Sequence, residues 1–465
     1  MSALPVMPAA LAPTDLRSFC SGTPPLDARL ADWMTDALAD PATLPEGSPV
    51  NLHDTGPFGE NIREMQQVAD RHGIELEIFF ARKANKALAY VAAARRLGIG
   101  VDTASEQELS QTLDAGLPAE RVISTAVIKT PALMRQIVES GCIASIDNAD
   151  ELDLLTAHVP EGRTTPAMIR LSGFEHEGRK LPSRFGVDID DAVVFVDRWP
   201  QAVSLVGVHV HLDGYDAQQR ASAALACLPL IDRWREAGHP IRFVDLGGGV
   251  PMSYLQSREQ WAAFQAAVAD TPDRVTHDAT AYRRGEAWST YPYWQQPTRG
   301  EWLDGLLATI ARPLRDRGLM LRLEPGRSLL DGCGLTVADV AFRKPLSAAA
   351  TAGPPATAIG LAMNRTQCRT TSEDFLVDPL LLPTGSDRDG QPLEGFVVGA
   401  YCMESEYLTK RRLRFPHGVA VGDRVVFPNT AGYLMHFLES RSHQFPLAKN
   451  YERTEQGWSL DAIDR

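Results

Sequence analysis

Short apolar runs alternate with longer amphipathic stretches between about residue 75 and residue 327. The apolar runs predict eight β-strands, at Glu75–Ala81, Gly100–Thr103, Arg121–Thr125, Ile143–Asp147, Ala167–Leu171, Leu205–Leu212, Ile241–Leu246 and Leu319–Leu323. The stretches between them predict helices, among them Ala87–Leu97, Glu106–Ala115, Pro131–Glu139, Asn148–Thr156 and Ala217–Ala237. Eight strand–helix alternations predict a TIM-like (β/α)8 barrel, and the competing architecture is an open, doubly wound sheet.

The hydrophobic pattern changes after Arg327. Alternating apolar runs at Thr336–Phe342, Gly395–Val398 and Arg424–Pro428 predict antiparallel strands. We therefore expect a barrel over residues 56–329 and a C-terminal antiparallel β-domain over residues 330–465. The N-terminal segment 1–55 precedes the first barrel strand, and we expect it to join the β-domain.

A long insertion, residues 252–304, separates the seventh predicted strand from the eighth. It is rich in aromatic residues, among them Trp261, Tyr282, Trp288, Tyr291, Tyr293 and Trp294. One interpretation is a segment that packs on itself or on a neighbouring subunit. The other is a lid over the active site, because long insertions after barrel strands often serve that purpose.

Composition and charge narrow the class of protein. The 465 residues carry a formal net charge of −13, which argues against nucleic acid or an anionic membrane as partner. Six cysteines are scattered without a CxxC pair, a pattern typical of reduced thiols in the cytoplasm. The N-terminus lacks the basic start of a signal peptide, and no apolar run is long enough to span a membrane.

Lys83 lies between a predicted strand and a predicted helix, in the sequence Phe79-Phe80-Ala81-Arg82-Lys83-Ala84-Asn85. Active sites of barrel enzymes form at the carboxyl ends of the strands. A partly desolvated lysine there can attack a carbonyl group. Taken alone, a lysine in such a turn is more commonly a solvated surface residue.

Two further strand ends carry groups suited to an anion. Asp245-Leu-Gly-Gly-Gly249 offers backbone N–H groups that can wrap a phosphate, although a glycine cluster is also simply a tight turn. Glu324-Pro-Gly-Arg327 adds a carboxylate for a protonated ring nitrogen and further phosphate donors, although Glu324 and Arg327 alone would suggest a surface ion pair. Both motifs follow the last two strands, where barrel phosphate sites recur.

Three polar residues end other predicted strands. His209 and His211 share one face of the sixth strand and are either hydrogen-bonded core histidines, a metal pair or, for His211, a group lying against an aromatic ring. Asp102 ends the second strand, where its carboxylate could bind the active-site amine. The nearby Ser105 and Glu108 predict a helix N-cap, which is compatible with that role.

The ordered set of these motifs resembles the fold-type III pyridoxal-phosphate enzymes, the alanine-racemase-like barrels, and in particular the diaminopimelate/ornithine decarboxylase group. The resemblance covers roughly residues 50–440 and suggests a divergent member. It rests on Ala81-Arg-Lys-Ala-Asn85, Gly100-Val-Asp-Thr-Ala-Ser105, Lys129, Ser183-Arg-Phe-Gly186, Gly207-Val-His-Val-His211, Asp245-Leu-Gly-Gly-Gly249, Glu324-Pro-Gly-Arg327, Cys402 and Tyr433.

The resemblance implies pyridoxal 5'-phosphate as cofactor and a role for each matching residue. Lys83 forms the internal aldimine, Asp102 and Arg170 belong to the cofactor site, His211 stacks on the ring, and Glu324 keeps the ring nitrogen protonated. The phosphate is bound by Gly248, Gly249, Gly326, Arg327 and Tyr433. Cys402 comes from the partner subunit of a homodimer and protonates the carbanion after CO₂ leaves.

Two departures from the family pattern concern the phosphate and the substrate. The family's Gly-Ser pair after the second histidine is Asp213-Gly214 here, so a phosphate contact is lost. The acid that follows the family's cysteine aligns with Met403 here, so we expect Glu404 or Glu406 to bind the substrate's distal group.

These observations predict a decarboxylase that removes the α-carboxylate of an amino acid or of an amino-acid conjugate. A racemase or epimerase on the same fold is the nearest alternative, but we identify no second base facing Lys83. A catalytically silent cofactor-binding regulator is the other.

Overall fold

The computed structural model describes residues 19–20, 24–269, 291–346, 356–370, 375–409 and 411–465. The chain forms two compact units. One is built from the described parts of Met1–Phe58, Met252–Gln295 and Leu330–Arg465, and the other from Gly59–Pro251 and Gln296–Leu329.

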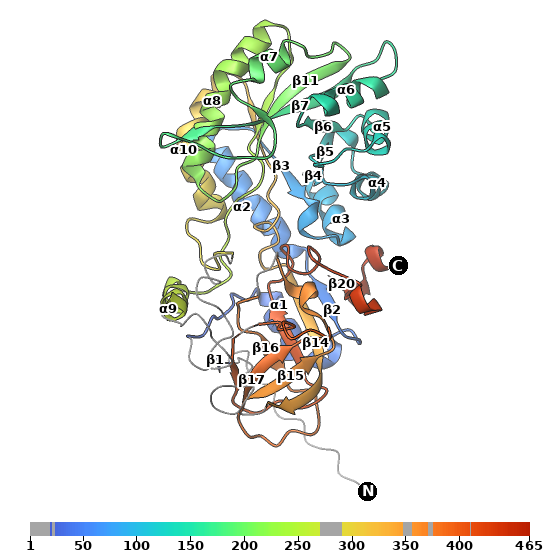
Figure 1. Cartoon of the computed structure of the whole chain (residues 1–465), viewed down its shortest axis with the longest axis vertical. Helices are drawn as coiled ribbons and strands as arrows, with labels where there is room; N and C mark the ends of the chain where they lie inside the picture. Colours follow the sequence, from blue (N-terminus) through green and yellow to red (C-terminus); the bar gives the residue numbers. More distant parts are fainter. Residues whose placement is uncertain (1–18, 21–23, 270–290, 347–355, 371–374, 410) are drawn as a thin grey trace. The chain divides into compact units, whose positions relative to one another are not determined.

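The second unit is a closed barrel of eight parallel strands (Figure 1). They are β3 (Leu76–Ala81), β4 (Gly100–Thr103), β5 (Val122–Ser124), β6 (Ile143–Ile146), β7 (Thr165–Ser172), β11 (Val203–Val210), β12 (Phe243–Asp245) and β13 (Met320–Leu323). Pairing of β13 with β3 and of β6 with β7 closes the ring, so the open sheet is excluded. All eight predicted barrel strands are confirmed.

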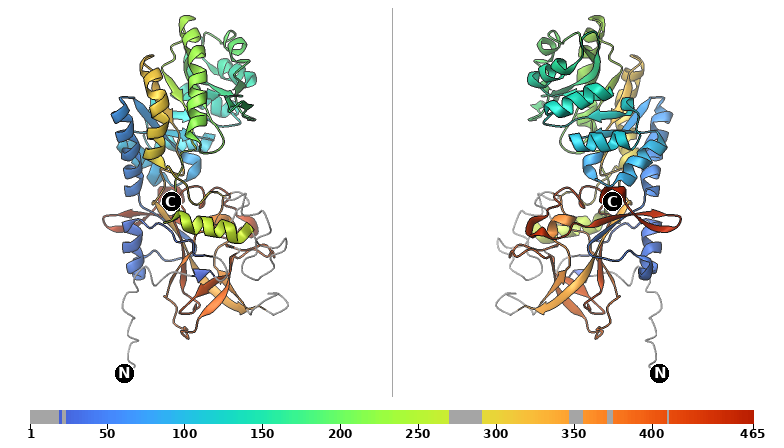
Figure 2. Two further views of the ribbon diagram at one scale, coloured as in Figure 1. Left: turned by 90° about the vertical axis from the view of Figure 1, so that its left-hand side faces the viewer. Right: turned by 90° about the vertical axis from the view of Figure 1, so that its right-hand side faces the viewer.

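Helices surround the strands on the outside of the barrel (Figure 2). They are α2 (Gly56–His72), α3 (Leu88–Leu97), α4 (Glu106–Asp114), α5 (Pro131–Ser140), α6 (Ala149–His158), the short α7 (Ala192–Val196), α8 (Ala217–Glu236) and α10 (Arg299–Arg315). Ser105 caps α4 by accepting a hydrogen bond from the N–H of Glu108, as its sequence predicts. Short strands β8 (Glu175–His176), β9 (Arg179–Lys180) and β10 (Val187–Asp188) follow β7.

Large side chains fill the barrel interior and need glycines opposite them. Most barrel strands contribute one apolar residue to a cluster in the interior, and Phe79 and Phe243 are two of these residues. A Cβ on Gly100 would lie 2.3 Å from the Phe79 ring, and one on Gly207 would lie 2.0 Å from the Phe243 ring. Each buried phenylalanine contributes about 1.5–3 kcal/mol by leaving water, so these two glycines make the packed interior possible.

The first unit is a mostly antiparallel β-domain. Its strands are β1 (Phe19–Cys20), β2 (Val50–His53), β14 (Gly334–Pro345), β15 (Thr357–Leu361), β16 (Leu380–Leu382), β17 (Leu393–Val398), β18 (Leu413–Phe415), β19 (Arg424–Pro428), β20 (Lys449–Thr454) and β21 (Gly457–Leu460). β2 lies between β14 and β20 in the sheet. The expectation that the N-terminal segment joins the C-terminal β-domain is therefore confirmed.

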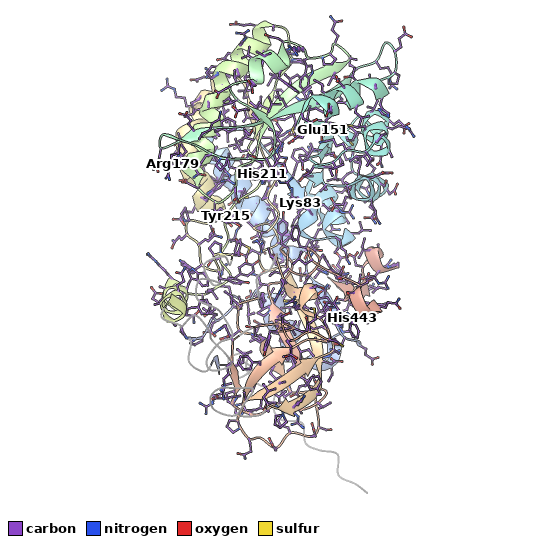
Figure 3. All side chains as sticks on the ribbon, viewed as in Figure 1. Lys83, Glu151, Arg179, His211, Tyr215 and His443 are labelled. Carbon is purple, nitrogen blue, oxygen red and sulfur yellow. The ribbon has the colours of Figure 1, made fainter. Side chains whose placement is uncertain are left out.

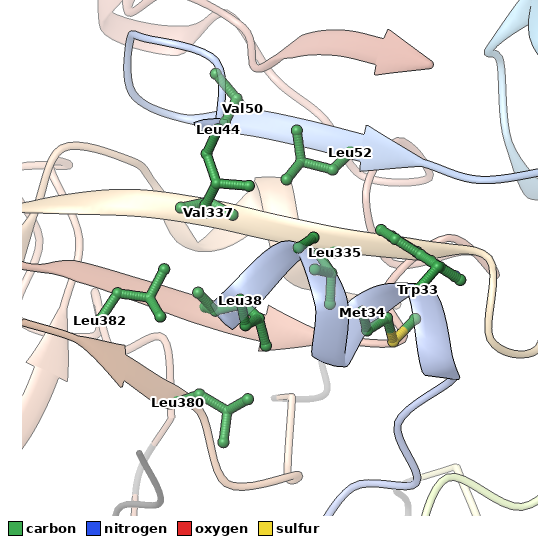
Figure 4. Close-up of a cluster of buried hydrophobic side chains, with 12 residues drawn as sticks. Trp33, Met34, Leu38, Leu44, Val50, Leu52, Leu335, Val337, Leu380 and Leu382 are labelled. Carbon is green, nitrogen blue, oxygen red and sulfur yellow. The ribbon is translucent and has the colours of Figure 1, made fainter. Parts of the chain in front are cut away.

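The β-domain has a core of its own. Helix α1 (Asp32–Ala39) packs Trp33, Met34 and Leu38 against apolar side chains of β2, β14 and β16 (Figure 4). Trp33 also donates from its indole N–H to the carbonyl of Gly332 at 2.7 Å. Residues of the N-terminal segment and of the C-terminal domain are therefore buried in one apolar cluster, which holds the N-terminal segment in the domain.

The described part of the long insertion up to Gln295 belongs to the β-domain unit, and residues 296–304 belong to the barrel unit. The part up to Gln295 contains α9 (Arg258–Ala269) and a group of packed rings, in which Tyr254 and Tyr293 have centroids 5.1 Å apart. The Tyr293 hydroxyl accepts a hydrogen bond from the N–H of Leu376 at 3.2 Å. Two of the aromatic residues singled out in the sequence, Tyr282 and Trp288, lie outside the described residues.

Two observations concern the predicted compartment. In the part of the chain that the structure describes, no helix combines the length and apolarity needed to cross a membrane. Cys142, Cys227, Cys333, Cys368 and Cys402 are free thiols. The location in the cytoplasm stays a prediction.

Candidate active site

Lys83 lies at the carboxyl end of the barrel, in a single turn of 3-10 helix, η3 (Arg82–Ala84), that directly follows β3. Its Nζ is 3.3 Å from Oδ2 of Asp102, which ends the neighbouring strand β4. The other oxygen of Asp102 accepts a hydrogen bond from the Thr125 hydroxyl at 2.7 Å. The Lys83 side chain is 35% exposed, whereas Asp102 is buried, so Lys83 is a partly buried amine on a fixed carboxylate rather than a solvated surface lysine.

Arg82 anchors the turn that carries Lys83. Its guanidinium is buried and donates to the carbonyl of Glu108 at 2.6 Å and to the hydroxyl of Thr112 at 3.3 Å, both on α4. The two adjacent residues of the turn therefore point to different sides of the strand end and have different roles. Arg82 fixes the backbone from outside the barrel, and Lys83 is left with its amine beside Asp102.

Two buried carboxyl groups, Asp245 and Glu324, lie at the ends of β12 and β13. Burial raises the pKa of Asp245 to about 6. Burial, reinforced by the charges of Asp245 and Asp102, raises the pKa of Glu324 well above its ordinary value. Burial therefore disfavours the charged form of both carboxyl groups, and Glu324 is not the surface residue that an ion pair with Arg327 would need.

His209 connects this carboxyl pair to the opposite wall of the barrel. Its Nδ1 is hydrogen-bonded to the Ser145 hydroxyl at 2.7 Å, and its Nε2 lies 3.6 Å from Oε1 of Glu324. Burial and nearby positive charges lower the pKa of His209 well below its ordinary value. Among the described residues, neither this Nε2 nor this Oε1 has a hydrogen-bond partner. Both atoms are therefore available to hydrogen-bond a polar group of a ligand.

His211 lies immediately after β11 (Figure 3). Burial, followed by the charges of Lys83, Arg170 and Arg220, lowers the pKa of His211 to about 3, so the ring is neutral at physiological pH. The Gly248 N–H donates to its Nδ1 at 3.4 Å. The ring is thus held by the glycine-rich turn and cannot repel a cationic group.

The glycine-rich turn after β12 has backbone angles that favour glycine. Gly247 and Gly249 have φ of +64° and +75°. A Cβ on Gly249 would lie 1.9 Å from the Arg220 guanidinium. In the described structure the N–H of Gly249 donates to no protein acceptor. The tight turn and the anion-binding interpretation are therefore compatible.

The segment after β13 adds a second set of candidate donors. Gly326 is buried, Arg327 is partly buried, and Ser328 is buried. No partner for the Ser328 hydroxyl lies within the described ranges of the chain. Sequence reasoning missed Ser328, although its place directly after Arg327 was a usable signal.

Arg170 lies on β7, two residues before the strand ends, and belongs to a second group of charged residues. Its guanidinium is 3.5 Å from Oδ1 of Asp147 and lies over the ring of Phe185, with its carbon 4.4 Å from the centroid. The neighbouring Lys129 pairs with Glu151 at 2.9 Å. Phe185 belongs to the Ser183–Gly186 motif, so the structure links that motif to the barrel site.

The other predicted site residues lie in the β-domain. Cys402 and Glu404 are exposed, and Tyr433 is partly buried with φ of +86°. Glu406 is buried, where it accepts a hydrogen bond from the N–H of Arg365 at 2.8 Å and lies 3.4 Å from its Nε. The structure thus groups the barrel candidates in one unit and these four in the other. Within its own domain, Glu406 already has a cationic partner.

One end of the barrel gathers a lysine beside a carboxylate, a neutral histidine, a pair of acids and a glycine-rich turn. This arrangement defines the chain as a (β/α)8 enzyme with a preformed ligand site. Residues 59–281 match the family model described as the pyridoxal-dependent decarboxylase, pyridoxal binding domain. The chain is 30% identical over 419 residues to the uncharacterized protein y4yA of Sinorhizobium fredii (strain NBRC 101917 / NGR234), covering 87% of each chain.

Two named decarboxylases are more distant. Diaminopimelate decarboxylase of Pseudomonas aeruginosa is 26% identical over 377 residues, which is 77% of this chain and 76% of the relative. The crystal structure of diaminopimelate decarboxylase from M. jannaschii has the same fold, with a TM-score of 0.68, 18% identity and 89% of each chain covered. The chain belongs to the fold-type III pyridoxal-dependent decarboxylases, as a divergent member, and pyridoxal phosphate is the cofactor of that family.

The barrel residues fit this cofactor. The buried Glu324 oxygen without a partner suits a ring N–H, and the free N–H of Gly249 and the unpartnered Ser328 hydroxyl suit a phosphate. His209, His211 and Glu324 also bring ligand atoms within 4.8 Å of one another, a spacing that a metal ion could bridge. The family resemblance predicts the cofactor ring, rather than a metal ion, at these strand ends.

Proposed function

We propose that this chain removes the α-carboxylate of an amino acid, or of a conjugate that bears an amino-acid end. The observation that carries the proposal is the buried carboxyl of Glu324 at the place expected for the ring nitrogen. Pyridoxal phosphate, when bound, accepts the electron pair that remains when a carboxylate leaves as CO₂. A carboxyl that keeps a proton on the ring nitrogen strengthens this capacity, which favours decarboxylation.

Each barrel residue has a part in the proposal. Lys83 binds the cofactor covalently through Nζ, and Asp102 orients that amine through the 3.3 Å contact. Asp245 and Asp102 raise the proton affinity around Glu324, so a proton stays between Glu324 and the ring nitrogen. Neutral His211 lies against the ring without competing for that proton. Gly248, Gly249, Gly326 and Arg327 bind the phosphate; a role for Tyr433 at the phosphate is implied by the family resemblance alone.

We further propose that the enzyme is a homodimer with shared sites, in the cytoplasm. The exposed thiol of Cys402 then comes from the partner subunit and returns a proton to the carbon that lost CO₂. Glu404, which is exposed, is the acid available for the substrate's distal group, whereas Glu406 is engaged by Arg365.

The decisive experiment measures CO₂ release by the cofactor-loaded protein. The substrates are L- and D-amino acids, including diamino acids and N-acylated or citryl-linked ones, with chiral analysis of the remainder. CO₂ with the matching amine establishes decarboxylation. A change of configuration without CO₂ would replace the proposal with a racemase. If the cofactor is bound but the panel gives neither CO₂ release nor a change of configuration, the result would favour a silent binding protein.

A mixing experiment tests the shared site. Lys83→Ala and Cys402→Ala are each expected to be inactive. If sites are shared across a dimer, half of a randomly reassorted mixture is heterodimer with one intact site of two, so about a quarter of the activity returns. Recovery of no activity after demonstrated subunit exchange would contradict sharing.

A further inference from the structure

Arg220 is a fully buried arginine whose hydrogen bonds go to backbone carbonyl groups. It lies in the first turn of α8, and its Nη2 donates to the carbonyls of Gly214 at 2.8 Å, Gly248 at 2.9 Å and Leu212 at 3.2 Å. Its Nε also reaches Gly248, and its Nη1 reaches the carbonyl of Asp216. One side chain therefore joins the turn after β11 to the glycine turn after β12.

A second residue holds the same turn. The carbon of the Arg220 guanidinium lies 5.6 Å from the ring centroid of Trp302 on α10, and the Trp302 indole N–H donates to the carbonyl of Tyr215 at 2.7 Å. Tyr215 marks this turn in Figure 3. The arrangement leaves Arg220 little freedom to move, so its position is a fixed property of the barrel.

The direction of the bound carbonyls determines the direction of the following N–H groups. In a planar trans peptide the C=O and the next N–H point to opposite sides. Because Arg220 draws the carbonyls of Leu212 and Gly248 toward itself, the N–H groups of Asp213 and Gly249 point away from it. Neither N–H donates to an acceptor in the part of the protein that the structure describes.

The charge of Arg220 acts in the same direction. Burial lowers its pKa to about 10, so the guanidinium remains positive at neutral pH. The same charge is the smallest of the causes that lower the pKa of His211. Carbonyl dipoles, rather than a close ion pair with a carboxylate, surround it, which leaves net positive potential beside the glycine turn.

We propose that Arg220 is a positioning residue for the cofactor phosphate and takes over the task of the serine that this chain lacks. Where the family has a Gly-Ser pair, Asp213-Gly214 stands here, and Gly214 has φ of +93°, which a serine would adopt only with strain. Arg220 compensates by aligning two backbone N–H donors and adding positive potential. It also offsets the Asp213 carboxylate, with which it interacts electrostatically.

The test compares pyridoxal phosphate with pyridoxal, which lacks the phosphate. Cofactor-free protein is titrated with each, and binding is followed by absorption of the lysine-bound cofactor. Arg220→Met should lower the ratio of the affinity for pyridoxal phosphate to that for pyridoxal by about tenfold or more, because two aligned N–H donors and the positive potential beside the phosphate are lost. Arg233→Met is the matched control, because Arg233 lies on the same helix with a side chain that is 58% exposed.

Three results would overturn the proposal. They are an unchanged affinity for pyridoxal phosphate, an equal loss for both ligands, and an equal effect of the control substitution. If Arg220→Met does not fold, Arg220→Lys takes its place. Lysine keeps the charge but cannot hold carbonyls on both turns, so the ratio should fall about threefold or more, and an unchanged ratio would again refute the role. This readout does not depend on any substrate, so it is separate from the decarboxylase assay.

Discussion

Asp245→Asn should make the cofactor-free protein more stable at neutral pH. The Asp245 side chain is buried, and its Oδ1 accepts a hydrogen bond from the Gly247 N–H at 2.9 Å. An asparagine keeps this acceptor, and its amide replaces Oδ2, which no donor of another described residue reaches. The substitution therefore removes a buried negative charge and retains the turn.

The magnitude follows from the pKa of Asp245, which burial raises from 3.8 to about 6. Between these values the folded protein binds more protons than the unfolded chain, so the free energy of unfolding falls as pH rises. A shift of about two units at about 1.4 kcal/mol each gives a loss of roughly 3 kcal/mol, complete above about pH 6. The variant should match the wild type near pH 4 and exceed it by up to about 3 kcal/mol at pH 7.

The assay is urea unfolding of both proteins without cofactor, at several pH values from 4 to 8. The wild-type midpoint should fall across this range, and the variant midpoint should change less. Equal pH dependence for both would refute the assignment of the titration to this carboxyl pair. With cofactor, the variant should be the poorer enzyme, because Asp245 no longer supports the proton at Glu324. That combination is the trade-off between stability and activity expected of a strained site.

Three further substitutions test separate parts of the structure. Glu324→Gln should cost the cofactor-free protein little stability at pH 7, since burial already disfavours the charged form of Glu324, but should slow CO₂ release by about 100-fold or more; normal turnover would remove Glu324 from the mechanism. Asp378→Asn should cost the β-domain about 3–5 kcal/mol of unfolding free energy, because buried Arg411 loses the negative charge of its 2.6 Å partner; a neutral effect in urea unfolding would contradict this. Arg365→Met should cost about 1–3 kcal/mol and raise the pKa of buried Glu406 further, so unfolding at pH 8 should be affected more than at pH 5, and an equal effect would argue against the pair.

The repeating parts of the fold could be predicted from the sequence, because each barrel strand is a short apolar run followed by a helix with its own signals. Strand β4 was predicted to the residue, and the cap at Ser105 was visible in the local sequence. The motifs at strand ends also identified Lys83, Asp102 and Glu324, because chain order alone brings parallel strand ends to one side.

What the sequence could not provide is contact between distant residues. Ser145 lies 64 positions before His209, and nothing near either residue indicates their hydrogen bond. Arg220 has the helical spacing of an ordinary α8 residue, and only the folded structure shows that it is buried on carbonyl groups from two turns. Glu406 likewise aligns with a substrate-binding acid, and its contact with Arg365 depends on a 3-10 helix that begins 41 residues earlier.

The interleaved order of the two units bears on how the protein is made. The barrel needs β13 to close against β3, and the pairing of Leu321 with Leu76 joins residues far apart in the chain. Strand β2 can pair on both sides only later still in synthesis, since its neighbour β20 begins at Lys449. A nascent chain therefore exposes unpaired strand edges until synthesis is nearly finished, a slow and aggregation-prone route that chaperones relieve. A fragment cut to residues 59–281 would keep the lysine but lack β13, and expression of the whole chain is the way to obtain a closed barrel.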